Sequence, residues 1–162
     1  MKKNNMLIAA IAITFFTSCN FSKGVKKDLT TGLSTSYNGF AIEDVYLTVD
    51  DNKLSSNKVT LGKEINIVAN GIENYEEKGD KVFPGCSILL TDKAGKEILN
   101  IADAFADMSA GVDKGKASLL TATLNTGNPM QVGETYHVKT RFFDKLKADS
   151  EILSNVDILM TN

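Results

Sequence analysis

The feature that most constrains the fold is a two-residue alternation of apolar and polar side chains, which recurs along most of the chain after residue 40. In one example, residues 120–124, three apolar side chains alternate with two threonines. Successive side chains of a β-strand point to opposite faces, so this pattern predicts strands with one buried face. Seven strands are predicted, near residues 40–49, 59–70, 82–91, 96–101, 116–124, 134–143 and 151–160.

The segments between these strands carry turn signals. Asp92-Lys-Ala-Gly95 is a four-residue connection that ends in glycine, which suits a type I turn closing on a left-handed residue. Seven short strands separated by turns predict an all-β sandwich. One segment departs from the alternation: Ile101, Phe105 and Met108 have helical spacing, which predicts a short helical turn near residues 102–108.

A tyrosine near the start of the sixth predicted strand refines the fold class. The pattern Gly133-x-x-Tyr136-x-Val138 follows the turn-rich "NTGNPMQV" and precedes Phe142-Phe-Asp. It resembles the tyrosine corner of immunoglobulin-like and fibronectin type III-like domains, although the Trp and paired Cys of antibody domains are absent. The resemblance implies a seven-stranded immunoglobulin-like sandwich over residues 37–162, in which Tyr136 buries its ring and bonds the preceding backbone through its hydroxyl.

The start of the chain has the features of an export signal. Two lysines at positions 2 and 3 precede the apolar run 6–16, which is shorter than the roughly 20 residues that span a bilayer. The segment Phe16-Thr-Ser-Cys19 resembles the lipobox of bacterial lipoproteins, with Phe16 in place of the usual Leu. The resemblance implies that residues 1–18 are a cleaved signal peptide and that Cys19 is lipidated. The alternative is a secreted protein that is cleaved elsewhere.

Residues 19–36 follow this cysteine and show no sustained periodicity. They are rich in Ser, Thr, Gly and Lys, which predicts a flexible tether behind the N-terminus that the lipobox resemblance implies is lipidated. The expected location is the bacterial cell envelope, at the outer membrane. No acidic run follows the cysteine of the kind that resembles surface-export signals, and this favours the periplasmic face.

Charge and composition exclude several activities. Lys2 and Lys3 account for two of the 18 basic residues, which leaves 16 against 20 acidic residues after cleavage. No basic excess or recognition motif therefore supports nucleic-acid binding. Cys86 and His137 both lie in predicted strands, and neither belongs to a catalytic motif, so Cys86 is expected to be a small buried residue. We predict no catalytic residue, metal or cofactor.

Calcium is the one metal for which the sequence offers candidate ligands. Asp103 and Asp107 would share a face of the predicted helical turn, and Asp113 lies beyond them. No EF-hand spacing is present, and isolated acidic residues are usually solvated, so the sequence favours solvation over calcium.

Three function classes remain, and a non-catalytic module that binds an envelope protein is preferred. Glycan binding ranks second because the chain has no Trp and its tyrosines are scattered, and an enzyme ranks last. The loops 72–81 and 144–150 should emerge at one end of the sandwich, as antibody binding loops do. We expect a partner to contact residues of these two loops, namely Tyr75, Glu76, Glu77, Lys145 and Lys147.

Overall fold

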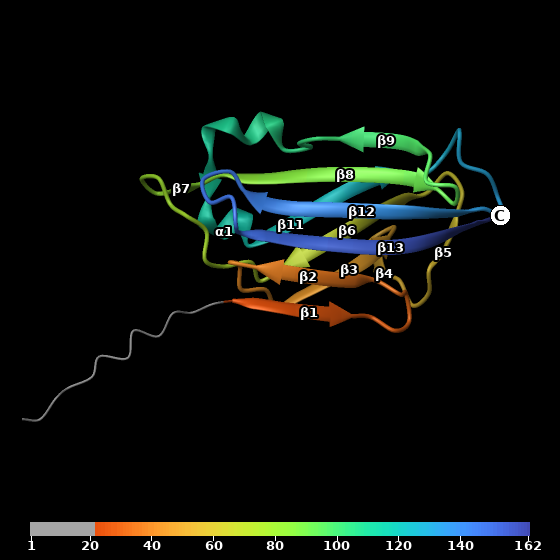
Figure 1. The fold of residues 1–162 in the computed structure, drawn as a ribbon, viewed down its shortest axis with the longest axis horizontal. Coiled ribbons are helices and arrows are strands. Elements are labelled where there is room, and N and C mark those ends of the chain that lie inside the picture. Colours follow the sequence, from red (N-terminus) through yellow and green to blue (C-terminus); the bar gives the residue numbers. More distant parts are fainter. Residues whose placement is uncertain (1–21) are drawn as a thin grey trace, which may run out of the picture.

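The computed structural model describes residues 22–162, which fold into a sandwich of two β-sheets (Figure 1). The larger sheet has the strand order β1-β2-β13-β12-β8-β9, and β5 pairs in parallel with the end of β13. Its strands are β1 Lys23–Lys27, β2 Ser34–Asn38, β5 Lys58–Thr60, β8 Pro84–Asp92, β9 Glu97–Ile101, β12 Thr135–Asp144 and β13 Glu151–Thr161.

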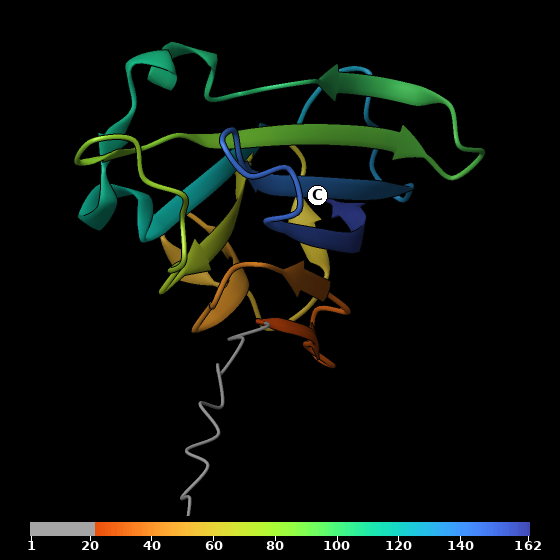
Figure 2. The same cartoon turned by 60° about the vertical axis from the view of Figure 1, so that its left-hand side comes forward.

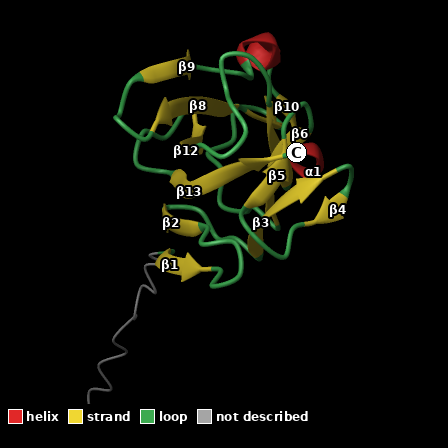
Figure 3. Cartoon of the chain, turned by 90° about the vertical axis from the view of Figure 1, so that its right-hand side faces the viewer, coloured by secondary structure: helices red, strands yellow, loops and turns green. Residues whose placement is uncertain are grey.

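The smaller sheet has the order β11-β6-β3-β4 and lies behind the larger one in the view of Figure 1. Its strands are β3 Asp44–Val49, β4 Asn52–Lys53, β6 Glu64–Asn70 and β11 Leu119–Asn125. Figure 3 shows the two layers from one end, with β9 to β1 in one and β3 and β4 in the other. The core fills the space between them and includes Leu47, Ile67, Ile88, Phe142 and Ile158.

The pairing of the strands confirms the immunoglobulin-like sandwich. The first, second and fifth predicted strands correspond to β3, β6 and β11 in one sheet. The third, fourth, sixth and seventh correspond to β8, β9, β12 and β13 in the other. This is the division into A-B-E and C-C′-F-G strands of immunoglobulin-like domains. The predicted hairpin is also present, because β8 pairs with β9 and Gly95 has a φ of +83°.

The N-terminal part of the domain was predicted incorrectly, because much of the expected tether over 19–36 is folded. β1 and β2 form an antiparallel hairpin, and β2 pairs with residues 151–155 of β13. Leu33 and Thr35 are buried, and the Thr35 and Ser154 hydroxyls lie 2.9 Å apart. The hairpin extends the sheet beyond the seventh strand, so the folded domain begins near residue 22 rather than residue 37. Residues 19–21 lie outside the described part.

The segment between β9 and β11 is more irregular than predicted. The helical turn is present but begins later, as the 3-10 helix η1 at Ala106–Ala110, and Phe105 just before it stacks on Phe142 with ring centroids 6.2 Å apart. Two short elements in this segment were not predicted: β10 Val112–Asp113, which pairs with β7 Lys81–Val82 just before β8, and the helix α1 Lys114–Ala117. Within residues 22–162, no helix has the length and apolarity to span a bilayer.

Candidate functional site

The two loops that were predicted to share one end of the sandwich do lie together. The buried carboxylate of Asp144 accepts a hydrogen bond from the Glu76 backbone N–H, with Oδ2 and N 2.7 Å apart. The Lys145 N–H donates to the Phe83 carbonyl at 2.9 Å. The prediction that loops 72–81 and 144–150 meet is therefore confirmed.

The central residue of the predicted contact surface, however, is buried. Tyr75 is 7% exposed, and its ring meets Phe40 edge-on at a centroid distance of 4.8 Å. Its hydroxyl donates to the Ala117 carbonyl at 3.0 Å, and burial raises the pKa of the phenol. The prediction that Tyr75 contacts a partner is therefore wrong. The loop directs this side chain into the core, where the ring packs at the end of the sandwich.

Two of the charged residues predicted beside Tyr75 form ion pairs within the chain. Glu77 pairs with Lys114 at 2.8 Å, and Lys145 pairs with Asp103 at 2.7 Å while its ammonium also donates to the Phe105 carbonyl. Lys145 therefore ties its loop to the segment before η1, which is a structural role. The exposed side chains of Glu76 and Lys147 make no hydrogen bond or ion pair with any other residue between 22 and 162.

Two of the three acidic residues considered for calcium, Asp103 and Asp113, form ion pairs within the chain. Burial opposes the charged form of Asp103, but hydrogen bonds from Lys145 and two backbone N–H groups outweigh it and hold the pKa of the carboxyl below its usual value. Asp113 pairs with Lys81. Across residues 22–162, no three His, Cys, Asp or Glu side chains form a group that could hold a metal ion.

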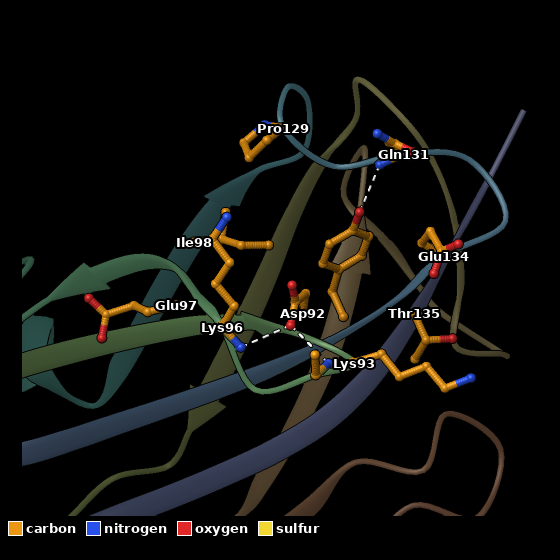
Figure 4. A pocket seen from close by; sticks show the side chains of 11 residues that line it. Asp92, Lys93, Lys96, Glu97, Ile98, Pro129, Gln131, Glu134 and Thr135 are labelled. Atoms are coloured by element: carbon orange, nitrogen blue, oxygen red, sulfur yellow. Dashed lines mark hydrogen bonds between the residues drawn. The ribbon is translucent and has the colours of Figure 1, made fainter.

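A groove of about 560 Å³ lies at the opposite end of the sandwich (Figure 4). One wall is the β8–β9 hairpin, and the other is the segment that leads from the Pro129 turn into β12. The side chains that line it are those of Asp92, Lys93, Ala94, Lys96, Glu97, Ile98, Pro129, Gln131, Glu134, Thr135 and Tyr136. None of these positions was predicted as a binding residue.

Each wall is held by a hydrogen-bonded turn. In the hairpin, Asp92 Oδ1 accepts the backbone N–H groups of Ala94 and Lys96 at 2.8 and 2.9 Å. In the opposite wall, the Tyr136 hydroxyl accepts the Gln131 N–H at 2.8 Å, and the tyrosine is 4% exposed. The predicted tyrosine corner is therefore confirmed, and it also fixes the backbone that presents Gln131 to the groove.

The groove offers charged, polar and apolar groups to a ligand. The charged ends of Lys93, Lys96 and Glu134 make no hydrogen bond or ion pair with the described residues, so they are available to a ligand. The Asn100 side-chain amide donates to a Glu97 carboxylate oxygen at 2.9 Å, and Ile98 and Pro129 add apolar surface. The lining therefore contains side chains of both charge signs, together with polar and apolar groups.

The cysteine and histidine of the domain lie on opposite faces of the larger sheet. Cys86 is fully buried, and burial together with the Asp103 carboxylate raises the pKa of its thiol to about 12. This agrees with the prediction that it is a packing residue. His137 is exposed on the outer face, where Nδ1 lies 2.5 Å from an Asp157 carboxylate oxygen.

Comparisons with known proteins support the fold and leave the function open. No protein-family model matches the chain, and no curated protein matches its sequence. One similar solved structure is the crystal structure of the C-terminal domain of wzt. It shares 9% sequence identity and a TM-score of 0.52 over 89% of this chain and 80% of that chain. At this identity the likeness shows a shared fold alone.

Cys19, the predicted lipidation site, lies outside the described residues. Its modification stays a prediction from the sequence.

Proposed function

We propose that the protein is a non-catalytic binding module that is anchored by a lipid on Cys19 in the bacterial envelope, at the periplasmic face of the outer membrane. Its groove between the β8–β9 hairpin and the 129–136 segment holds a segment of a protein partner. The observation that carries this proposal is the groove itself, in which the charged ends of Lys93, Lys96 and Glu134 have no partner within residues 22–162 and lie near a small apolar surface.

The mixture of groups favours a polypeptide ligand. The lysines and glutamates can pair with side chains of either sign, while Gln131 and Thr135 can bond peptide groups. Ile98 and Pro129 offer apolar contact between them. Such a combination of a few polar groups around an apolar surface is typical of recognition sites.

A neutral glycan is the second candidate, because Gln131, Glu134 and Thr135 could also bond sugar hydroxyls. Glycan sites generally use an exposed aromatic ring as a platform. The single aromatic residue in this groove is Tyr136, which is buried and engaged in the corner. The protein ligand therefore ranks first.

The position of the groove supports this role for an anchored domain. Figure 1 shows that the chain enters β1 at one end of the sandwich and that the β8–β9 hairpin lies at the other end. Only residues 20 and 21 separate Cys19 from the first described residue, a link that can span at most about 11 Å. A lipid on Cys19 would thus hold the domain close to the membrane with its groove at the far end.

Site-specific photo-crosslinking in intact cells tests this proposal. Thr135 in the groove and Lys147 at the opposite end are each replaced by a photoreactive residue, and the melting temperature of each variant serves as the control for folding. We expect a discrete protein adduct from position 135 and none from position 147. An adduct from position 135 that shrinks on glycosidase treatment would favour the glycan. Equal adducts at both positions, or none at position 135, would refute a groove ligand.

A further inference from the structure

The edges of the two sheets differ in how well they are protected from pairing with another strand. An edge strand exposes unpaired backbone N–H and C=O groups, and proteins commonly blunt such edges with lysines, bulges or short strands. β1 carries three lysines in five residues, β4 has two residues, and β9 contains Glu97 and a register shift against β8. Each of these edges is therefore protected.

The outer edge of β11 has none of these devices. β11 is seven residues long, contains no charged residue and no proline, and among residues 22–162 pairs with β6 alone. Its pairing with β6 is continuous over all seven residues, so no bulge bends it away. Leu119 at its start is 52% exposed. We call this the β11 edge, and within residues 22–162 it offers seven consecutive residues to a further strand.

The sequence of β11 shows which strand fits there. Residues 120–124 read Leu-Thr-Ala-Thr-Leu, which is the same in both directions. If two copies pair in antiparallel fashion about a two-fold axis at Ala122, Leu120 lies opposite Leu124 and Thr121 opposite Thr123. Identical residue types then face each other on both sides of the sheet, as a self-complementary interface requires.

We propose that the protein forms a homodimer through antiparallel pairing of β11 with β11 of a second copy. The two four-stranded sheets would join into one continuous sheet across the two-fold axis. The buried face would continue as Leu-Ala-Leu, and the exposed face would place threonine against threonine, a favourable cross-strand pair. No like charges meet along these five residues. A strand of another protein could pair with β11 without any palindrome in the β11 sequence. The palindrome therefore favours a second copy of this chain as the partner.

A pair of double variants tests both the dimer and its register. In Thr121→Lys/Thr123→Lys, each introduced lysine faces a lysine of the second copy. In Thr121→Lys/Thr123→Glu, each lysine faces a glutamate. Both variants lose the hydrogen bond from Thr123 to Asn66 equally, so this loss cancels in the comparison. Like charges directly opposite each other weaken strand pairing and opposite charges support it, so the dissociation constants should differ by about tenfold or more.

The readout is sedimentation velocity of the full chain in detergent, with excess micelles, over a wide range of protein concentration. We expect a concentration-dependent dimer for the wild type and the Lys/Glu variant, and a monomer for the Lys/Lys variant. Val25→Lys on the edge strand β1 is the matched control and should remain dimeric. Melting temperatures confirm that every variant is folded. A wild type that is monomeric throughout, or a Lys/Lys variant that dimerises as well as the Lys/Glu variant, would overturn the proposal.

Discussion

Tyr75 offers the sharpest test of how the loop end of the sandwich is built. Its ring lies against Phe40, and its hydroxyl donates to the Ala117 carbonyl at 3.0 Å. Tyr75→Phe keeps the ring and removes the donor, so it should lower the free energy of unfolding by about 1 to 2 kcal/mol, the usual effect of leaving a buried acceptor unpaired. Tyr75→Ala also removes the packed ring and should cost about 3 to 5 kcal/mol.

Urea denaturation of a soluble chain that begins at residue 19 and carries Cys19→Ser measures both values. A domain of this size has a total stability of roughly 5 to 15 kcal/mol, so the alanine variant should unfold at a clearly lower urea concentration. Lys147→Ala is the matched control, because this exposed residue lies in the neighbouring loop and should change stability by less than about 0.5 kcal/mol. If Tyr75→Ala unfolds at the same urea concentration as the control, the tyrosine is not part of the core. The sequence-based prediction that Tyr75 is an exposed contact residue would then stand.

Three further predictions concern other parts of the domain. Tyr136→Phe leaves the Gln131 N–H without its acceptor and should cost about 1 to 3 kcal/mol in the same urea assay; an unchanged midpoint would mean that the corner bond is not formed. Hydrogen bonds from Thr30 lower the pKa of Asp28 from 3.8 to about 2. The turn between β1 and β2 should therefore be fully stabilised above pH 3.8 and should loosen as the pH falls toward 2. Hydrogen exchange of the Thr30 amide can follow this change, and the same pH profile in Asp28→Asn would contradict the prediction. Cys86 is buried with a raised thiol pKa, so it should react with a thiol reagent only after denaturation, and rapid labelling of the native protein would show that this part of the core opens.

The two-residue alternation was enough to predict the sandwich, because several main strands bury every second side chain, as β11, β12 and β13 do along their whole length. It failed for β1 and β2, since Lys-Gly-Val-Lys-Lys has a single apolar residue and the hairpin depends on pairing with β13, more than 100 residues later in the chain. Local periodicity carries no information about such a distant partner.

The candidate site was harder to predict for a similar reason. Both walls of the groove were recognised as turns, at Asp92-Lys-Ala-Gly95 and at "NTGNPMQV", but their proximity depends on which strands pair. At Tyr75, by contrast, the sequence predicted a binding residue and the structure has a core residue. An aromatic residue in a charged loop resembles a binding residue in the sequence, and only the fold shows that its ring reaches Phe40. The corner tyrosine was predictable because its hydrogen bond spans five residues of the same chain segment.

The lipid anchor is the part of the proposed function that would place the domain at a membrane. The most direct test is the intact mass of the mature protein purified from cells, combined with N-terminal peptide analysis. We predict a chain that begins at Cys19 and carries the added mass of a lipid on that residue. A mature chain with an unmodified Cys19, or one that begins at a different residue, would contradict the account.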